Sequence, residues 1–305
     1  MLPPDDFDPP VGVAETLEPG LRRIVAPNPS PMTYRGTNTY MVGTRGLAVI
    51  DPGPLSDAHL SAIQNAVGPD QQITHIIVTH THLDHSPLAR PLAEKSGAPV
   101  LAFGDATAGI SEVMQRLTKG GLIGGGEGID TGFSPDIVLA DNETVQGDGW
   151  ELQAIHTPGH IGNHLSFAWG DACFTADHVM GWASSLVSPP DGDLTDFMTS
   201  CARLASSPWR IFYPGHGAPV NSPAARLEWL VNHRLSREAA ILAALKAGPA
   251  TAQAIAQDVY ADTPAALLGA ATRNVLAHLV DLTGKSLVTP KGNLHAEAHF
   301  RLAEK

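Results

Sequence analysis

Residues 79–86 have the sequence THTHLDHS, which places three imidazoles and one carboxylate within six positions. These side chains cannot all share one face of a regular helix or strand, so the segment is predicted to be a tight loop. It follows the apolar run Ile76–Val78, which is typical of a buried strand. Imidazole nitrogen and carboxylate oxygen are ligands that zinc accepts, and manganese and iron accept them too. The sequence therefore predicts a metal-binding loop at the end of a strand; the alternative is a polar loop with solvated histidines.

Three further residues of the same chemical types follow other strand-like segments. His160 comes after residues 152–155, Asp177 after residues 172–174, and His216 after residues 210–212. Loops that leave the ends of strands often carry functional residues on a rigid scaffold. One loop rarely supplies enough ligands for a two-metal site, and these three residues are placed to complete one.

Taken in order, the H-x-H-x-D-H motif and the three later residues resemble the ligand series of the metallo-β-lactamase fold superfamily, over roughly residues 20–220. This resemblance implies an α/β fold built as an αββα sandwich. It also implies two metal ions. The first would be held by His80, His82 and His160, and the second by Asp84, His85 and His216. Asp177 would bridge the two ions.

Two substitutions found in branches of this superfamily are absent here. A glutamate occupies the place of His82 in diiron flavoprotein relatives, and a cysteine occupies that of Asp177 in antibiotic-hydrolysing zinc enzymes. The site therefore looks like the phosphodiesterase, thioesterase and glyoxalase type. Two divalent ions, zinc by default and otherwise manganese or iron, would lie about 3.5–4 Å apart and share a hydroxide that attacks a carbonyl carbon or a phosphorus. Asp84 would be a metal ligand and also the catalytic residue that accepts a proton from the attacking water.

Other elements of the N-terminal part can be predicted from apolar spacing and turn residues. Strands are expected at residues 21–26, 38–42, 47–51 and 98–102, and helices at residues 55–67, 87–96 and 195–205. Ser56 or Asp57 is expected to cap the first of these helices.

The last 85 residues predict a small separate domain. Helical spacing covers residues 226–247, which would form one long helix or two joined ones, and also residues 251–259 and 266–282. Two strand-like segments follow, at residues 286–289 and 294–302, with a turn around Pro290 between them. Three helices and a hairpin give a winged-helix-like outline, so the predicted domains are residues 1–220 (catalytic) and 221–305 (C-terminal). Together with the linking segment His233–Glu238, this outline resembles the branch of the superfamily named for beta-lactamase-like protein 2, whose animal members are endoribonucleases. The branch also resembles thioesterases that act beside polyketide synthases.

Charge is divided unevenly between the two predicted domains. The chain has 19 Lys+Arg and 31 Asp+Glu. Residues 221–305 contain 9 of the basic and 7 of the acidic residues, whereas residues 1–220 contain 10 basic and 24 acidic residues. So acidic a catalytic domain would repel a polyanion, and no arginine-rich run compensates. We therefore expect a hydrolase of a small acyl substrate (thioester, ester or lactam). The alternatives are an endoribonuclease or phosphodiesterase acting on single-stranded RNA, and a non-enzymatic winged-helix regulator with a relict metal site.

The first ten residues are acidic and proline-rich, without the basic start and apolar core of a signal peptide or membrane span. Cys173 and Cys201 form neither a C-x-x-C pair nor a disulfide framework. These features predict a cytoplasmic protein with no membrane segment and with both thiols in the core. The oligomeric state stays open, a homodimer included.

Several other residues have two interpretations. Asp51, at a strand end, either orients the histidine loop or accepts bonds from turn amides. The glycine-rich residues 120–128 are predicted to form a flexible flap rather than a phosphate-binding loop. Trp182, in the connection 181–193, is either a stacking surface for substrate or a packing residue. Of the remaining histidines, His156 is predicted to form a buried hydrogen bond, His164 to be structural, His178 to point away from the site, and His59, His278, His295 and His299 to be surface or packing residues.

Overall fold

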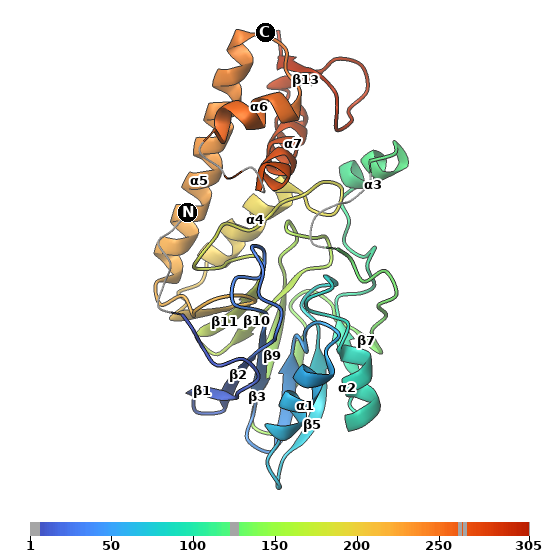
Figure 1. Ribbon diagram of the computed structural model, residues 1–305, viewed down its shortest axis with the longest axis vertical. Coiled ribbons are helices and arrows are strands. Elements are labelled where there is room, and N and C mark those ends of the chain that lie inside the picture. The colour runs from blue at the N-terminus through green and yellow to red at the C-terminus, as the bar shows by residue number, and fades with distance from the viewer. Residues whose placement is uncertain (1–6, 123–127, 262–263, 265–266, 305) are drawn as a thin grey trace.

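A computed structural model describes residues 7–122, 128–261, 264 and 267–304. Two β-sheets pack face to face, and a helical region follows at the C-terminal end of the chain (Figure 1). The first sheet contains, in spatial order, β1 (Glu15–Glu18), β2 (Leu21–Val25), β3 (Asn38–Val42), β4 (Gly46–Ile50), β5 (Gln72–Ile77), β6 (Val100–Ala102) and β7 (Ile137–Val138). The second contains β12 (Ile211–Pro214), β11 (Ala172–Ala176), β10 (Leu165–Trp169), β9 (Glu151–His156) and β8 (Thr144–Gln146).

Strand β4 illustrates why this sequence forms a layered sandwich. All five of its residues are buried: Ala48 and Ile50 lie in the core between the sheets, and Leu47 and Val49 in the core under the outer helices. Side chains alternate between the faces of a strand, so a strand covered on both faces has a continuous apolar sequence. Strands β4 and β5 are parallel, so the loops that follow them lie at the same edge of the sheet.

Helices cover the outer face of each sheet. On the first sheet, α1 (Asp57–Asn65) and α2 (Ala89–Ser96) bury Ile63 and Leu92, and on the second sheet α4 (Leu194–Ala205) buries Phe197. The Ser56 hydroxyl accepts a hydrogen bond from the backbone N–H of His59, as expected for the cap of α1. The predicted αββα sandwich is therefore confirmed.

Among its described residues, the C-terminal region contains three α-helices, one short 3-10 helix and a pair of strands. Helix α5 (Pro223–Ala244) continues into the short helix η1 (Leu245–Ala247) and is followed by α6 (Ala252–Val259), α7 (Leu268–Gly284), β13 (Val288–Pro290) and β14 (Phe300–Leu302), which pairs antiparallel with β13. One end of α5 packs on the sandwich through Leu227 and Leu230, and the other packs on α6 and α7 through Ile241. This helix therefore belongs to both cores, and it runs along one side of the molecule (Figure 1).

Helix α3 (Glu112–Lys119) was not predicted, and it joins the two parts of the chain. Its Met114 and Leu117 belong to the apolar cluster of the C-terminal helices, and α3 lies close to the lower end of α7 in the view of Figure 1. Ser111 caps α3 by accepting from the backbone N–H of Met114. The cap and the apolar spacing were both present in the sequence, so this helix could have been found.

Other differences concern short or irregular segments. Strands β1, β7 and β8 were not predicted, because two to four residues are too few for a clear alternation and both residues of β7 are exposed. The predicted hairpin strand at residues 294–302 was too long, since only Phe300–Leu302 pair and Ala298 donates to His295 in a turn. Pro290 lies in β13 rather than in the turn.

The predicted glycine-rich flap lies partly outside the described residues, at 123–127. Where the chain is described again, the carbonyl of Gly128 accepts from the backbone N–H of Leu83 at 3.2 Å. Cys173 and Cys201 are buried and free, as predicted. Among the described residues, no helix combines the length and the apolar character that crossing a bilayer requires.

Candidate metal centre

Three histidines form the first cluster of the candidate metal centre. His80 and His82 lie in the loop after β5, His160 lies in the loop after β9, and all three are buried. Nε2 of His160 lies 3.0 Å from Nδ1 of His82. Nδ1 of His160 lies 2.8 Å from the carbonyl oxygen of Leu186, and donation to that oxygen leaves Nε2 able to bind a metal. Nδ1 of His80 is similarly occupied by the Thr79 hydroxyl, at 2.9 Å.

The second cluster contains two aspartates and two histidines from the ends of three strands. Oδ2 of Asp84 lies 3.1 Å from Nε2 of His216 and 3.4 Å from Nε2 of His85. Oδ1 of Asp177 lies 3.5 Å from Nε2 of His85, and its Oδ2 lies 3.3 Å from Nε2 of His216. The same Oδ2 lies 3.7 Å from Nε2 of His160, so Asp177 contacts both clusters. All the ligand residues that the sequence predicted are therefore brought together.

The clusters fit metal ions in distance and in chemistry. Within each cluster the candidate ligand atoms lie within 4.8 Å of one another. A tetrahedral zinc ion about 2.0–2.1 Å from its ligands would hold them about 3.3–3.4 Å apart, which is close to the separations of 3.1 to 3.5 Å in the second cluster. Among the described residues, the buried atoms Nε2 of His80 and Oδ1 of Asp177 have no hydrogen-bond partner. Such atoms are costly unless another group binds them, so the cluster is suited to metal.

Asp51 holds the histidine loop in place. It directly follows β4 with a positive φ of 50°. Its Oδ1 accepts from the backbone N–H of Thr79 at 2.8 Å, and its Oδ2 accepts from the Thr79 hydroxyl at 2.7 Å and from Nδ1 of His85 at 2.9 Å. Because the Thr79 hydroxyl also contacts His80, one carboxylate orients a histidine of each cluster. The first of the two interpretations of Asp51 is therefore the correct one.

Gly215 permits the close approach of β12 to the second cluster. A Cβ atom at this position would lie 2.2 Å from Oδ1 of Asp177 and 2.9 Å from Cε1 of His85. Only glycine leaves that space open. Sequence reasoning did not single out this residue, although it directly precedes His216.

Burial and opposite charge act against each other on the pKa values of these ligands. Burial would lower the pKa of His216, but Asp177 and Asp84 raise it to about 10. In the same way, burial of His85 is outweighed by its carboxylate neighbours, which raise its pKa well above the usual value. Burial and the nearby His85 lower the pKa of His80. Metal binding to the second cluster would therefore displace protons from its imidazoles.

Two histidines near the clusters lie behind them. Nδ1 of His164 lies 2.9 Å from the Thr157 hydroxyl, and its ring packs 5.2 Å from that of His80. Nε2 of His178 lies 3.5 Å from Sγ of Cys201 on α4, so this ring points away from the site, as predicted. Both rings are fully buried.

The other histidines have ordinary structural contacts. Nε2 of His156 lies 2.9 Å from the carbonyl oxygen of Gly162, which is the hydrogen bond that was predicted. His59 is buried, with Nε2 2.8 Å from the Thr39 hydroxyl. His278 is also buried, whereas His295 and His299 are exposed.

Trp182 packs against the N-terminal part of the chain. Its ring stacks on that of Tyr34 with centroids 5.0 Å apart, and Tyr34 stacks on Phe7. A Cβ atom on Gly217, next to His216, would lie 2.7 Å from Cδ1 of Trp182. The packing role of Trp182 is thus observed beside the candidate metal centre, and its role as a stacking surface for substrate stays a prediction.

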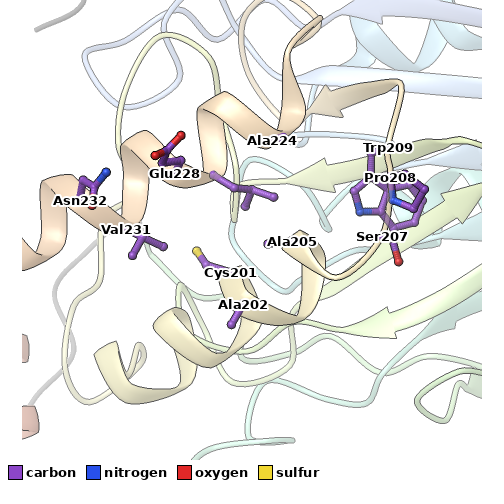
Figure 2. Close-up of a pocket in the computed structure, with 11 residues that line it drawn as sticks. Cys201, Ala202, Ala205, Ser207, Pro208, Trp209, Ala224, Glu228, Val231 and Asn232 are labelled. Atoms are coloured by element: carbon purple, nitrogen blue, oxygen red, sulfur yellow. The ribbon is translucent and has the colours of Figure 1, made fainter.

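A cavity of about 310 Å³ lies between α4 and α5 (Figure 2). Cys201, Trp209 and Val231 are among its lining residues, and none of the candidate metal ligands lines it. Burial raises the pKa of Cys201 to about 12, so its thiol is not a nucleophile at neutral pH. This cavity is therefore separate from the chemistry of the two clusters.

Comparisons with known proteins agree with this architecture. The metallo-beta-lactamase superfamily model matches residues 32–227, and the beta-lactamase-associated winged helix domain model matches residues 251–293. The chain is 32% identical over 275 residues to a beta-lactamase-like protein 2 homolog of Drosophila melanogaster, covering 85% of this chain and 86% of that protein. It is 29% identical over 271 residues to the homolog of Caenorhabditis elegans, with coverages of 86% and 83%.

A solved structure is similar over nearly the whole chain. The crystal structure of a metallo-beta-lactamase family protein from Thermus thermophilus matches with a TM-score of 0.74 and 25% identity, covering 94% of this chain and all of that one (100%). Proteins of this superfamily are generally metal-dependent hydrolases, and the C-terminal winged-helix prediction is confirmed. With its two clusters of histidines and aspartates, the chain is an enzyme that belongs to the metallo-beta-lactamase superfamily and carries the winged-helix domain associated with it.

Proposed function

We propose that the chain hydrolyses its substrate with two divalent metal ions, zinc by default and otherwise manganese or iron. The observation that carries this proposal is the position of Asp177, whose Oδ2 lies 3.3 Å from Nε2 of His216 and 3.7 Å from Nε2 of His160. Such ions, when bound, supply an acidified water as the nucleophile and polarise an oxygen of the substrate. The ligands would be His80, His82 and His160 for one ion, Asp84, His85 and His216 for the other, and Asp177 for both.

Asp84 is the proposed catalytic residue because it is the least buried member of the second cluster. Its side chain is 18% exposed, whereas those of His85 and Asp177 are 0% and 2% exposed. Burial would raise the pKa of Asp84, but His85 and His216 hold it well below the usual value, so the group is an ionised carboxylate. A carboxylate in this place can accept a proton from the attacking water.

The basic side chains of the C-terminal domain support a small acyl substrate, because most of them contact groups of the chain itself. Six of its basic side chains donate to carbonyl oxygens or pair with carboxylates of the chain itself: Arg226, Arg234, Arg237, Arg273, Lys285 and Arg301. Binding RNA depends on cations that are free to contact phosphates. Together with the acidic catalytic domain, these internal contacts favour a thioester, an ester or a lactam.

Cleavage of single-stranded RNA is the second candidate, because a winged-helix domain is present at residues 251–293. A regulator with a relict metal site is the third, and the complete set of ligand residues in two buried clusters counts against it. We also propose that the domains are residues 1–220 and 221–305, since α5, which begins at Pro223, leads out of the sandwich. The two buried free thiols fit a reducing cytoplasm.

The test is parallel turnover of the zinc-loaded chain on a panel of acyl thioesters, esters and lactams and on short single-stranded RNA. His82→Ala is the inactive control, and His299→Ala, at an exposed position, is the matched control that should keep activity. We expect the unmodified chain and His299→Ala to hydrolyse an acyl compound, His82→Ala to lose this activity, and the RNA to stay intact with all three proteins. RNA cleavage that His82→Ala loses, without acyl hydrolysis, would support the second candidate, and metal-loaded protein inactive on every substrate would support the third.

A further inference from the structure

The connection from Asp177 to α4 is held by side chains of the C-terminal helices. Arg226 of α5 donates to the carbonyls of Met180 and Ala183, both at 2.6 Å. Farther along α5, Arg234 donates to the carbonyl of Ser185. From α7, the Asn274 side-chain oxygen accepts from the backbone N–H of Val187 at 3.2 Å, and Arg273 donates to Ser188 Oγ at 3.1 Å.

The centre of this connection contacts two of the proposed metal ligands. The Ser185 hydroxyl donates to the carbonyl of Asp177 and lies 2.9 Å from the carbonyl of His178. The next residue, Leu186, accepts through its carbonyl oxygen from Nδ1 of His160 at 2.8 Å. Residues 185–187 therefore link the C-terminal helices on one side to His160 and Asp177 on the other.

Arg234 and Asn274 bind each other as well as this segment. The Arg234 guanidinium donates to the Asn274 side-chain oxygen at 3.0 Å, so one oxygen accepts from both Arg234 and Val187. Arg234 is 2% exposed and lies over the ring of Phe197, with 5.0 Å between its Cζ and the ring centroid. No carboxylate pairs with it among the residues that the structure describes.

A buried cation without an ion pair is a poor stabilising element. Taking a charge out of water is costly unless the charge is paired and hydrogen-bonded. Among the described residues, the hydrogen bonds of Arg234 go to Ser185 and Asn274, and its guanidinium lies over the ring of Phe197. The buried position of Arg234 is therefore explained by its hydrogen bonds to Ser185 and Asn274, which hold the 185–187 segment in place.

We propose that Arg234 and Asn274 are positioning residues of the metal centre. By fixing residues 185–187, they keep the Leu186 carbonyl in contact with Nδ1 of His160, so that Nε2 would be available to bind a metal. They also keep the Ser185 hydroxyl in contact with the backbone of Asp177. The winged-helix domain thus completes the support of the catalytic site. This inference rests on the proposed metal site, and it gives the C-terminal domain a role that requires no nucleic acid.

The experiment measures Co²⁺ binding to full-length variants. Partners that orient metal ligands typically contribute about 10- to 100-fold in metal affinity. We expect Arg234→Met to raise the Co²⁺ dissociation constant by about that factor and to change the visible spectrum of the bound cobalt. Arg237→Met is the matched control, because Arg237 lies on the same helix but donates to Val259 and packs on Tyr260, away from residues 185–187. It should leave both the affinity and the spectrum unchanged.

A second pair of variants tests the inference if Arg234→Met fails to fold. Asn274→Asp keeps an oxygen that can accept from Val187 and Arg234, whereas Asn274→Ala removes it. We expect weaker Co²⁺ binding and a changed spectrum for Asn274→Ala, and restoration of both by Asn274→Asp. If folded Arg234→Met or Asn274→Ala kept the Co²⁺ affinity and the cobalt spectrum of the unmodified chain, this inference would be overturned, while the proposed metal site would still stand. An unmodified chain that binds no Co²⁺ would instead overturn the proposed metal site.

Discussion

Oδ2 of Asp51 lies 2.9 Å from Nδ1 of His85, although the two residues are 34 positions apart in the sequence. The parallel pairing of β4 and β5 brings them together, because each residue follows the carboxyl end of its strand. Through the Thr79 hydroxyl the same carboxylate also reaches His80. One buried aspartate that is not itself a proposed ligand therefore sets the tautomer of a histidine in each cluster.

Replacing Asp51 with asparagine should weaken metal binding in both clusters. An asparagine has one acceptor oxygen where the carboxylate has two. Its amide nitrogen would face either the backbone N–H of Thr79 or the pair formed by Nδ1–H of His85 and the Thr79 hydroxyl, which are all donors. We expect a loss of about 10- to 100-fold in zinc affinity, measured by competition with a chromophoric chelator. Asp136→Asn is the control, since Asp136 accepts from the backbone of Val100 and contacts Arg90. Equal zinc affinity in the two variants would contradict the role of Asp51.

Adding one methyl group at Gly215 should disturb the second cluster. Its Cβ would lie 2.2 Å from Oδ1 of Asp177, which is impossible without moving that carboxylate or the backbone. We expect Gly215→Ala to bind less than the full complement of zinc, measured by elemental analysis after gel filtration. Gly181→Ala is the matched control, because its Cβ would meet nothing closer than Val220 at 3.4 Å. Full zinc content in Gly215→Ala would show that the carboxylate is free to move.

Replacing Asp84 with asparagine should affect turnover more than metal content. The amide keeps one oxygen that can ligate, but it cannot take up a proton from water. Groups that transfer protons contribute about 10²–10⁴-fold to rate, so kcat should fall by a factor in that range. Measuring kcat together with zinc content separates the two roles. Near-normal turnover in a metal-loaded Asp84→Asn variant would remove the catalytic role of this residue.

The residues of the two clusters could be found from the sequence because their signals are local. A histidine-rich loop after an apolar run, and single histidines or aspartates after later strands, are visible without knowledge of which strands pair. The role of Asp51 could not be decided, since it depends on the contact between β4 and β5. Gly215 was missed for a similar reason, because its importance depends on how closely Asp177 approaches it.

Contacts between distant parts of the chain were the least predictable. Arg234 and Asn274 lie on two different helices and are 40 residues apart in sequence, and nothing in the spacing marks either residue. The packing of α3 on the C-terminal helices likewise depends on tertiary structure. The boundaries of β3 agreed with the prediction at residues 38–42, because this strand is a buried run of five residues.

The buried His278 should make the protein sensitive to acid. Burial, with a contribution from Arg234, lowers its pKa to about 3, and its ring nitrogens have no hydrogen-bond partner among the described residues. The usual pKa of histidine is about 6.5, so between about pH 6.5 and pH 3 the unfolded chain binds a proton that the folded chain does not. The free energy of unfolding must therefore fall as the pH falls through this range, by up to about 1.4 kcal/mol per pH unit from this group.

His278→Leu removes that titration and sacrifices no hydrogen bond among the described residues, so its unfolding free energy should depend less steeply on pH than that of the unmodified chain. Urea unfolding at pH 7 and pH 5, in a chelator so that loss of metal does not contribute, measures the difference. His299→Leu, at an exposed position of the same domain, should leave the pH dependence unchanged. If His278→Leu lost stability with acid as steeply as the unmodified chain, His278 would have to be protonated in the folded state, and a polar group would have to reach its ring when the pH falls.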